Sequence, residues 1–177
     1  MPSILARGSP QEMARSKSSA SWLSRHLSDP FVKQAQKDGY RSRSAYKLIE
    51  LNEKDKLIRP GMRILDLGSA PGGWSQVAGR IVGAKGRVLA TDILPMDAVL
   101  NVDFIQGDFT EDAIVQQLLD WLGGGRFDLI VSDIAPNITG ISSADQASSI
   151  YFLELALDTV RKTLKPGATF VAKMFQG

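Results

Sequence analysis

From Met62 onward, short apolar runs alternate with longer segments whose apolar residues recur at helical spacing. The runs predict strands over 63–67 (RILDL), 87–91 (RVLAT), 102–105 (VDFI), 127–132 (FDLIVS) and 169–175 (TFVAKMF). Helices are predicted over 73–82, about 113–122 and about 145–164. The apolar positions of the last helix are Ile150, Leu153, Leu157, Val160 and Leu164. Apolar strands that alternate with helices are typical of a parallel sheet covered on both faces. We therefore expect an α/β, Rossmann-like, doubly wound sheet that binds ligands at the carboxyl ends of its strands.

Two further helices precede this alternation. Asp29 and Pro30 are typical of a helix start, and Gly39 of the end of a short helix over FVKQAQKD. A second helix is predicted from about Ser44 to Lys54, with Ala45, Leu48 and Ile49 on one face. The length suits one domain with a substantial core. We expect a flexible basic arm over 1–28 and a single domain over 29–177, with residues 1–12 as an extension before a natural start at Met13.

The basic residues are unevenly distributed. The net charge is only +2 and the isoelectric point about 8.9, yet ten lysines and arginines but five acids lie between Arg15 and Lys56. A basic segment on a near-neutral body suits a polyanion such as nucleic acid, and a solvated charged face explains it equally well.

Several classes of site are disfavoured by composition. The chain has no cysteine and one histidine, His26, so disulfides, a thiolate nucleophile and a histidine metal site are not expected. We predict no bound metal. No apolar run approaches the length of a membrane span. We therefore expect no membrane partner, a cytoplasmic location and, in the absence of an exposed apolar stripe, a monomer.

The turn after the first predicted strand reads Gly68-Ser69-Ala70-Pro71-Gly72-Gly73. It lacks the middle glycine of the dinucleotide fingerprint, and Pro71 removes a backbone N–H, which argues against a nicotinamide dehydrogenase. The remaining amides and the positive end of the next helix can still hold a carboxylate, such as that of S-adenosylmethionine (SAM). A tight turn without a ligand is the alternative for this stretch alone.

Three aspartates stand at the ends of consecutive strands. Asp92 can accept hydrogen bonds from ribose hydroxyls, Asp108 from an adenine amino group, and Asp133 faces the expected cleft. Each alone is explained by a turn or a helix cap, whereas three beside a glycine turn indicate a binding site. Trp74 is either a wall of that pocket or a core residue.

Two lysines complete the pattern. Lys173 lies within an apolar run that predicts a buried strand, where an unpaired charge is costly, so we expect it to have a role. Lys47 is either a solvated helix residue or a second member of the site. If both converge on Asp133, burial and like charge favour the neutral amine of Lys173, which could take a proton from a ribose 2′-hydroxyl.

Six segments of the chain resemble the FtsJ/RrmJ family of SAM-dependent RNA ribose 2′-O-methyltransferases. They read RSRSAYKL, DLGSAPGGWSQ, TDILPMD, VDFIQGDF, SDIAPN and FVAKMFQG. The resemblance implies a catalytic set of Lys47, Asp133 and Lys173, with Lys173 as the base. It implies SAM contacts at Gly72, Trp74, Asp92, Asp108 and Asp133, to which the turn adds Gly68 and Gly73. RNA phosphates would contact Arg41 and Arg43, together with Lys17 and Arg25 of the arm.

The expected substrate is a uridine in the 23S rRNA of the large ribosomal subunit. Related family members modify tRNA, and these motifs barely separate the two substrates. A non-catalytic SAM- or RNA-binding assembly factor is a further alternative. It is suggested by the chain ending at Gly177, whereas relatives continue through two more strands to a fourth catalytic residue, a glutamate. The polar segment 137–149 is expected to be a mobile loop that helps to choose the RNA.

Overall fold

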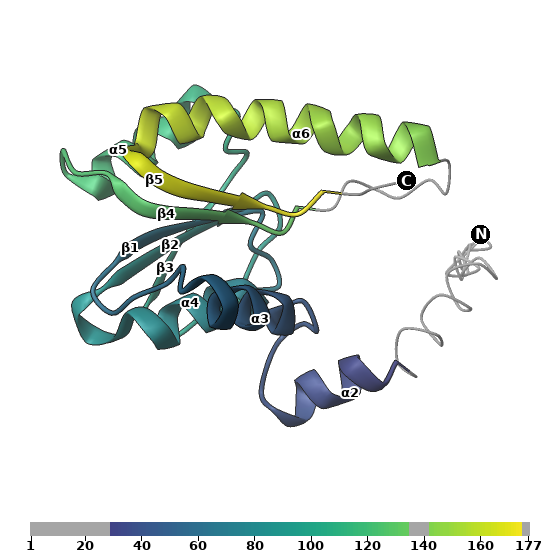
Figure 1. Ribbon diagram of the computed structural model, residues 1–177. Helices are drawn as coiled ribbons and strands as arrows, with labels where there is room; N and C mark the ends of the chain where they lie inside the picture. Colours follow the sequence, from purple (N-terminus) through teal and green to yellow (C-terminus); the bar gives the residue numbers. More distant parts are fainter. Residues whose placement is uncertain (1–28, 135–141, 175–177) are drawn as a thin grey trace, which may run out of the picture.

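A computed structural model describes residues 29–134 and 142–174. Its sheet contains β1 (Arg63–Leu67), β2 (Arg87–Asp92), β3 (Val102–Gln106), β4 (Phe127–Ser132) and β5 (Leu164–Ala172). All four strand pairings are parallel, and the order is β3-β2-β1-β4-β5 (Figure 1). The order reverses between β1 and β4, which is where such sheets open a crevice for ligands. The predicted doubly wound α/β fold is confirmed.

Helices cover both faces of the sheet. Below it in Figure 1 lie α3 (Ala45–Asp55) and α4 (Gly73–Val82), and above it lie α5 (Asp112–Leu122) and α6 (Ser142–Thr163). The alternation of β1 explains the two cores, because Ile64 packs with α3 and α4 whereas Leu65 and Leu67 pack with α5 and α6. A short 3₁₀ turn, η1 (Gly83–Lys85), leads from α4 into β2.

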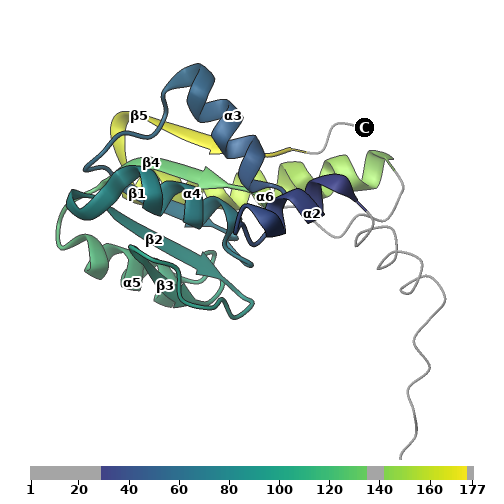
Figure 2. The ribbon, with the colours of Figure 1, turned by 90° about the horizontal axis from the view of Figure 1, so that it is seen from below.

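Helix α2 (Pro30–Lys37) lies near the carboxyl ends of the strands (Figure 2). It begins as the sequence predicts, because the Asp29 side chain accepts a hydrogen bond of 2.8 Å from the backbone N–H of Phe31. Val32 and Ala35 are buried beneath the helix. Gly39, with a φ of 77°, reverses the chain toward α3.

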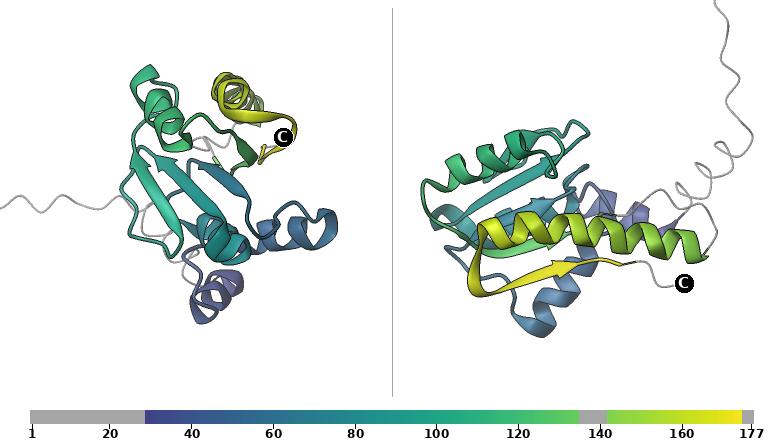
Figure 3. Two further views of the ribbon diagram at one scale, coloured as in Figure 1. Left: turned by 90° about the vertical axis from the view of Figure 1, so that its left-hand side faces the viewer. Right: turned by 90° about the horizontal axis from the view of Figure 1, so that it is seen from above.

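The boundary between α6 and β5 differs from the prediction. Helix α6 ends at Thr163 and β5 begins at once with Leu164, so the two run side by side (Figure 3). Leu164 is opposite Phe127, but the next pair is Thr169 opposite Leu129, so the intervening residues bulge from the ladder. That bulge holds Pro166, which has no N–H to donate, and Gly167, whose φ is 77°.

Other predictions near α6 also need correction. The helix begins at Ser142, so the end of the predicted mobile loop 137–149 is helical, and 137–141 lie outside the described residues. Ile150, predicted on the apolar face, is 41% exposed. The predicted arm over 1–28, with Lys17 and Arg25, also lies outside the described residues. Within the described part of the chain, no helix combines the length and hydropathy needed to cross a bilayer.

Candidate active site

Two cavities open at the carboxyl ends of the strands. One, of about 410 Å³, lies beside α2 and is called the α2 cavity; Val32, Arg43, Asp66 and Trp74 are among its walls. The other, of about 660 Å³, is called the strand-end cavity, and it is lined by Asp92 and Asp108. Gly68, Ala70 and Asp133 line both. Asp133 therefore lies where the two spaces adjoin.

The structure brings the three strand-end aspartates to one cavity, as the sequence predicts. Asp92 accepts hydrogen bonds from the backbone N–H of Ala70 (2.9 Å) and of Leu94 (2.8 Å). Asp108 accepts from the N–H of Thr110 at 2.9 Å and from its hydroxyl at 2.7 Å. Each carboxylate is thus a turn cap that keeps further lone pairs for a ligand. The structural and functional interpretations of these residues are compatible.

The apolar walls of the strand-end cavity were not foreseen. They include Ile93 and Leu94 after β2, and Tyr151 and Phe152 on α6. The two aromatic rings lie edge to face, 6.2 Å between centroids. Apolar walls with a few convergent carboxylates suit a ligand that has both an aromatic group and hydroxyls. The sequence analysis did not select Tyr151 and Phe152 because they are not among the apolar residues that recur at helical spacing in α6.

The glycines of the turn are required by close packing. A Cβ on Gly68 would lie 2.1 Å from Cγ1 of Ile134, and one on Gly73 would lie 2.2 Å from Oγ of Ser42. Gly68 lines both cavities and Gly73 lines the α2 cavity, whereas Gly72 is not among the lining residues of either. Its φ of 109° is one that only glycine adopts readily.

Trp74 is a core residue, and its predicted place in the cofactor pocket stays a prediction. Its side chain is 3% exposed and belongs to the core beneath α3, and it also lines the α2 cavity. Its indole N–H donates to the backbone oxygen of Ser44 at 2.8 Å. It is not among the residues that line the strand-end cavity.

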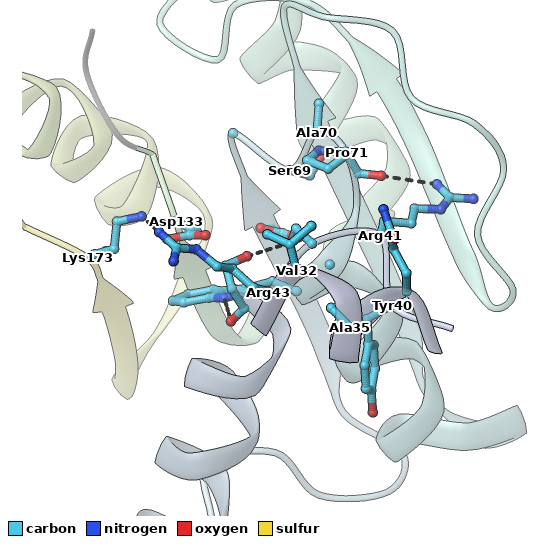
Figure 4. Close-up of a pocket in the computed structure, with 17 residues that line it drawn as sticks. Val32, Ala35, Tyr40, Arg41, Arg43, Ser69, Ala70, Pro71, Asp133 and Lys173 are labelled. Atoms are coloured by element: carbon cyan, nitrogen blue, oxygen red, sulfur yellow. Dashed lines mark hydrogen bonds and ion pairs between the residues drawn. The ribbon is translucent and has the colours of Figure 1, made fainter. Parts of the chain in front are cut away.

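Asp133 and Lys173 face each other where β4 and β5 end (Figure 4). The backbone N–H of Lys173 donates to the oxygen of Ser132 at 2.9 Å, which aligns the two residues. The Lys173 Nζ atom then lies 2.5 Å from Asp133 Oδ1. This oxygen is buried, and the Lys173 ammonium is its charged partner. The site therefore holds an amine against a carboxylate at the junction of the cavities.

The predicted burial of Lys173 is wrong. Strand β5 ends at Ala172, and the Lys173 side chain is 46% exposed. Because β5 has a strand neighbour only on the β4 side among the described residues, flanking apolar residues do not enclose its last positions.

Lys47 does not join this pair in the structure. Its Nζ atom lies 3.1 Å from a carboxylate oxygen of Glu50 on the same helix, and its side chain is 56% exposed. It lines neither cavity. The expected convergence of two lysines on Asp133 is therefore absent from this conformation.

The two arginines predicted to contact RNA differ from each other. Arg43 pairs with Asp29 and is 56% exposed. Arg41 is half-buried, and its guanidinium donates to backbone carbonyl oxygens of the protein itself. In this structure these donors are therefore engaged by the fold itself, and the contact of Arg41 with RNA phosphates stays a prediction.

Asp66 is a site residue that the sequence reasoning missed. It is completely buried on β1, its Oδ2 accepts a 2.6 Å hydrogen bond from the Ser75 hydroxyl, and its Oδ1 has no partner among the described residues. Burial raises its pKa to about 7, the charges of Asp133 and Asp92 add to the rise, and Ser75 opposes it. The available signal was an acid inside the apolar run RILDL. No metal-binding cluster of His, Cys, Asp or Glu is found among the described residues.

Comparisons with known proteins bear on this site. The model of the FtsJ-like methyltransferase family matches residues 40–177. The chain is 73% identical over 165 residues to ribosomal RNA large subunit methyltransferase E of Stutzerimonas stutzeri, and 61% identical to the protein of the same name from Marinobacter nauticus. Each match covers 93% of this chain and 80% of the relative. A crystal structure of a ribosomal RNA methyltransferase from Plasmodium falciparum matches with a TM-score of 0.73 and 33% identity, covering 78% of this chain and 80% of that one.

Proposed function

Because this chain belongs to the FtsJ-like methyltransferase family, we propose that it methylates the ribose 2′-oxygen of a uridine in 23S rRNA, with SAM as methyl donor. The observation that carries the proposal is the Lys173–Asp133 pair at the junction of two cavities. One cavity would hold the cofactor and the other the target nucleotide, so that the methyl group and the 2′-oxygen meet beside the amine. Holding the two reactants in line is a main source of rate acceleration in such a site.

The strand-end cavity fits SAM. When bound, SAM supplies a methyl group on a positively charged sulfur. Asp92 would accept hydrogen bonds from the ribose hydroxyls and Asp108 from the adenine amino group, while Tyr151 and Phe152 would pack on the apolar parts. The backbone amides of the turn from Gly68 to Gly73, which leads into α4, would hold the carboxylate of SAM.

Lys173 would act as the general base. Its neutral amine would take the proton of the ribose 2′-hydroxyl as the 2′-oxygen bonds to the methyl carbon and the bond from that carbon to the SAM sulfur breaks, which leaves a neutral thioether. Asp133 would hold the resulting ammonium in place. The Lys173 side chain is 46% exposed and lines the α2 cavity, where the target nucleotide would lie.

Lys47 would enter the site only when RNA is bound. Its ion pair with Glu50 is exposed at both ends, and such pairs contribute little to stability. A lysine has a flexible four-carbon stem, so Lys47 can exchange Glu50 for the negatively charged substrate at small cost. Arg43, and Lys17 and Arg25 from the predicted arm, would contact RNA phosphates.

The names of the relatives favour ribosomal RNA over tRNA as substrate. The experiment offers the protein labelled SAM with unmodified large ribosomal subunits, free 23S rRNA and bulk tRNA. We expect label in ribosomal RNA and none in tRNA. Label in tRNA alone would overturn the substrate assignment. SAM binding without transfer to any RNA would favour an assembly factor instead.

A further inference from the structure

Arg41 uses its guanidinium to hold main-chain carbonyls. Its Nη1 atom donates to the oxygens of Asp97 (2.7 Å) and Pro71 (3.3 Å), and its Nη2 atom donates to the oxygen of Ala98 (2.6 Å). Figure 4 shows the side chain reaching toward Pro71 across the α2 cavity from Lys173. No carboxylate forms an ion pair with Arg41 among the described residues. Backbone dipoles therefore take the place of a counter-charge.

The three carbonyls belong to two segments that build the strand-end cavity. Pro71 follows Ala70, which lines that cavity, and Asp97 and Ala98 lie in the connection 93–101, which begins with the lining residues Ile93 and Leu94. The glycine turn is also joined to the end of β2, directly before this connection, by the hydrogen bond from Ala70 N–H to Asp92. The Arg41 side chain thus provides a second link, between the glycine turn at Pro71 and the connection at Asp97 and Ala98. A Cβ on Gly72 would approach both Nη1 of Arg41 (3.2 Å) and Sδ of Met96 (3.0 Å), so the link is closely packed.

Arg41 is itself fixed to the start of α4. Its backbone N–H donates to Oε1 of Gln76 at 2.8 Å, and Nε2 of Gln76 donates to the oxygen of Gly39 at 3.0 Å. Gln76 lies in the first turns of α4, directly after the glycine turn. The backbone of Arg41 is therefore held at α4, while its side chain contacts both the glycine turn and the connection 93–101.

An arginine suits this role and a lysine does not. The planar guanidinium presents donors in a fixed fork, which can meet carbonyls of two segments at once, whereas an ammonium is a single point donor on a flexible stem. Hydrogen bonds from charged donors are also about twice as strong as neutral ones. Removing the fork would free the middle of the connection, at Asp97 and Ala98, while its ends keep the hydrogen bonds of Gln106 to the Ile93 oxygen and of Asn101 to the Gly79 oxygen.

We propose that Arg41 is a positioning residue for the cofactor, which fixes the connection 93–101 against the glycine turn and so keeps Asp92 in its SAM-binding place. This rests on the proposed function, because it takes the strand-end cavity as the SAM site. It replaces the role in RNA binding that the basic segment suggested. The two roles differ in a measurable way, since cofactor positioning acts without RNA and a phosphate contact does not.

The test compares Arg41→Ala, Arg41→Lys and Arg43→Ala with the wild type. Calorimetric titration gives the Kd for SAM without RNA, and transfer assays give the KM for unmodified large subunits at saturating SAM and several salt concentrations. We expect Arg41→Ala to weaken SAM binding about tenfold and Arg41→Lys at least about threefold, as loss of charge-assisted hydrogen bonds implies. The KM for ribosomal subunits and its salt dependence should change less than about twofold.

Arg43→Ala is the matched control because its guanidinium is exposed and directed at Asp29. We expect it to bind SAM as the wild type does, to raise the KM for subunits and to lower the salt slope by about one. Wild-type affinity for SAM in folded Arg41→Ala, with a raised KM for subunits, would overturn the inference. If Arg41→Ala fails to fold by circular dichroism, the Arg41→Lys comparison decides. A wild-type protein that binds no SAM would refute the proposed function instead.

Discussion

The Nζ atom of Lys173 lies 2.5 Å from Oδ1 of Asp133, and the two residues follow the ends of adjacent strands. A second lysine–aspartate pair, Lys165 with Asp128, joins the same two strands toward their opposite ends. Only the pair at the carboxyl ends borders the two cavities. Since the chemistry of parallel sheets takes place at that edge, position separates a candidate catalytic pair from a structural one.

Lys47 and Glu50 give the first prediction. If Lys47 enters the site with RNA, Lys47→Ala lowers kcat for large subunits at least about tenfold, because a charge near the reacting oxygen is lost. Glu50→Ala should leave kcat within about twofold, because it removes only an exposed partner. Steady-state transfer assays measure both. Equal effects of the two substitutions would mean that the surface ion pair, not Lys47 in the site, is what matters.

Asp92 gives the second prediction. Asp92→Asn keeps the shape of the side chain but removes the charge that would accept ribose hydroxyls. We expect the Kd for SAM to rise about 10- to 100-fold, which corresponds to the roughly 1.5–3 kcal/mol typical of a hydrogen bond to a charged group. Calorimetric titration measures it, with Asp120→Asn on the exposed face of α5 as the control. An unchanged Kd would remove Asp92 from the cofactor site.

Asp66 gives a prediction about pH. Its pKa of about 7 in the folded protein exceeds the ordinary value of 3.8, because burial disfavours the charged form. The folded state therefore binds more protons than the unfolded chain between about pH 4 and pH 7, so this group makes the free energy of unfolding fall as pH rises through that window. The substitution Asp66→Asn removes the titrating group, and with it this fall in the free energy of unfolding.

The measurement for Asp66 is urea unfolding at pH 4.5, 6 and 7.5. The free energy of unfolding of Asp66→Asn, relative to the wild type, should increase by about 1 to 3 kcal/mol from the lowest pH to the highest, given about 1.4 kcal/mol per unit of pKa change. Asp120→Asn, at an exposed aspartate on α5, is measured in parallel as the control for the substitution itself. A difference between Asp66→Asn and the wild type that does not vary with pH would show that Asp66 titrates normally.

The sequence predicted correctly those helices and strands that are marked by nearby residues, such as an apolar run, a turn or a helix cap. The four strands from Arg63 to Ser132 and helix α4 follow from apolar runs and a glycine turn, and α2 follows from the Asp29 cap. The start of β5, predicted at Thr169, was misjudged because the apolar residue Leu164 suits the end of a helix as well as the start of a strand. Leu164 belongs to the strand because it pairs with Phe127 of β4, and such a long-range contact cannot be predicted from the local sequence.

In the site, too, some features were predictable from the sequence and others depend on the three-dimensional structure. Convergence of Asp92, Asp108 and Asp133 follows from topology alone, since parallel strands end at one edge. The orientation of a long side chain does not follow, so Lys47 and Arg41 were both assigned to partners that they do not meet here. Asp66 was missed because a single acid within a strand carries no periodic signal.

The central claim is that Lys173 beside Asp133 activates a ribose 2′-oxygen of 23S rRNA. The most direct test incubates unmodified large subunits with SAM and wild-type protein, Lys173→Ala or Lys165→Ala, then digests the RNA and identifies the methylated nucleoside by mass spectrometry. SAM binding of each protein is measured in parallel. The account predicts 2′-O-methyluridine from the wild type and Lys165→Ala, and a rate at least about 100-fold lower from Lys173→Ala with SAM binding intact. Full-rate formation by Lys173→Ala, or a methyl group on a base, would contradict it.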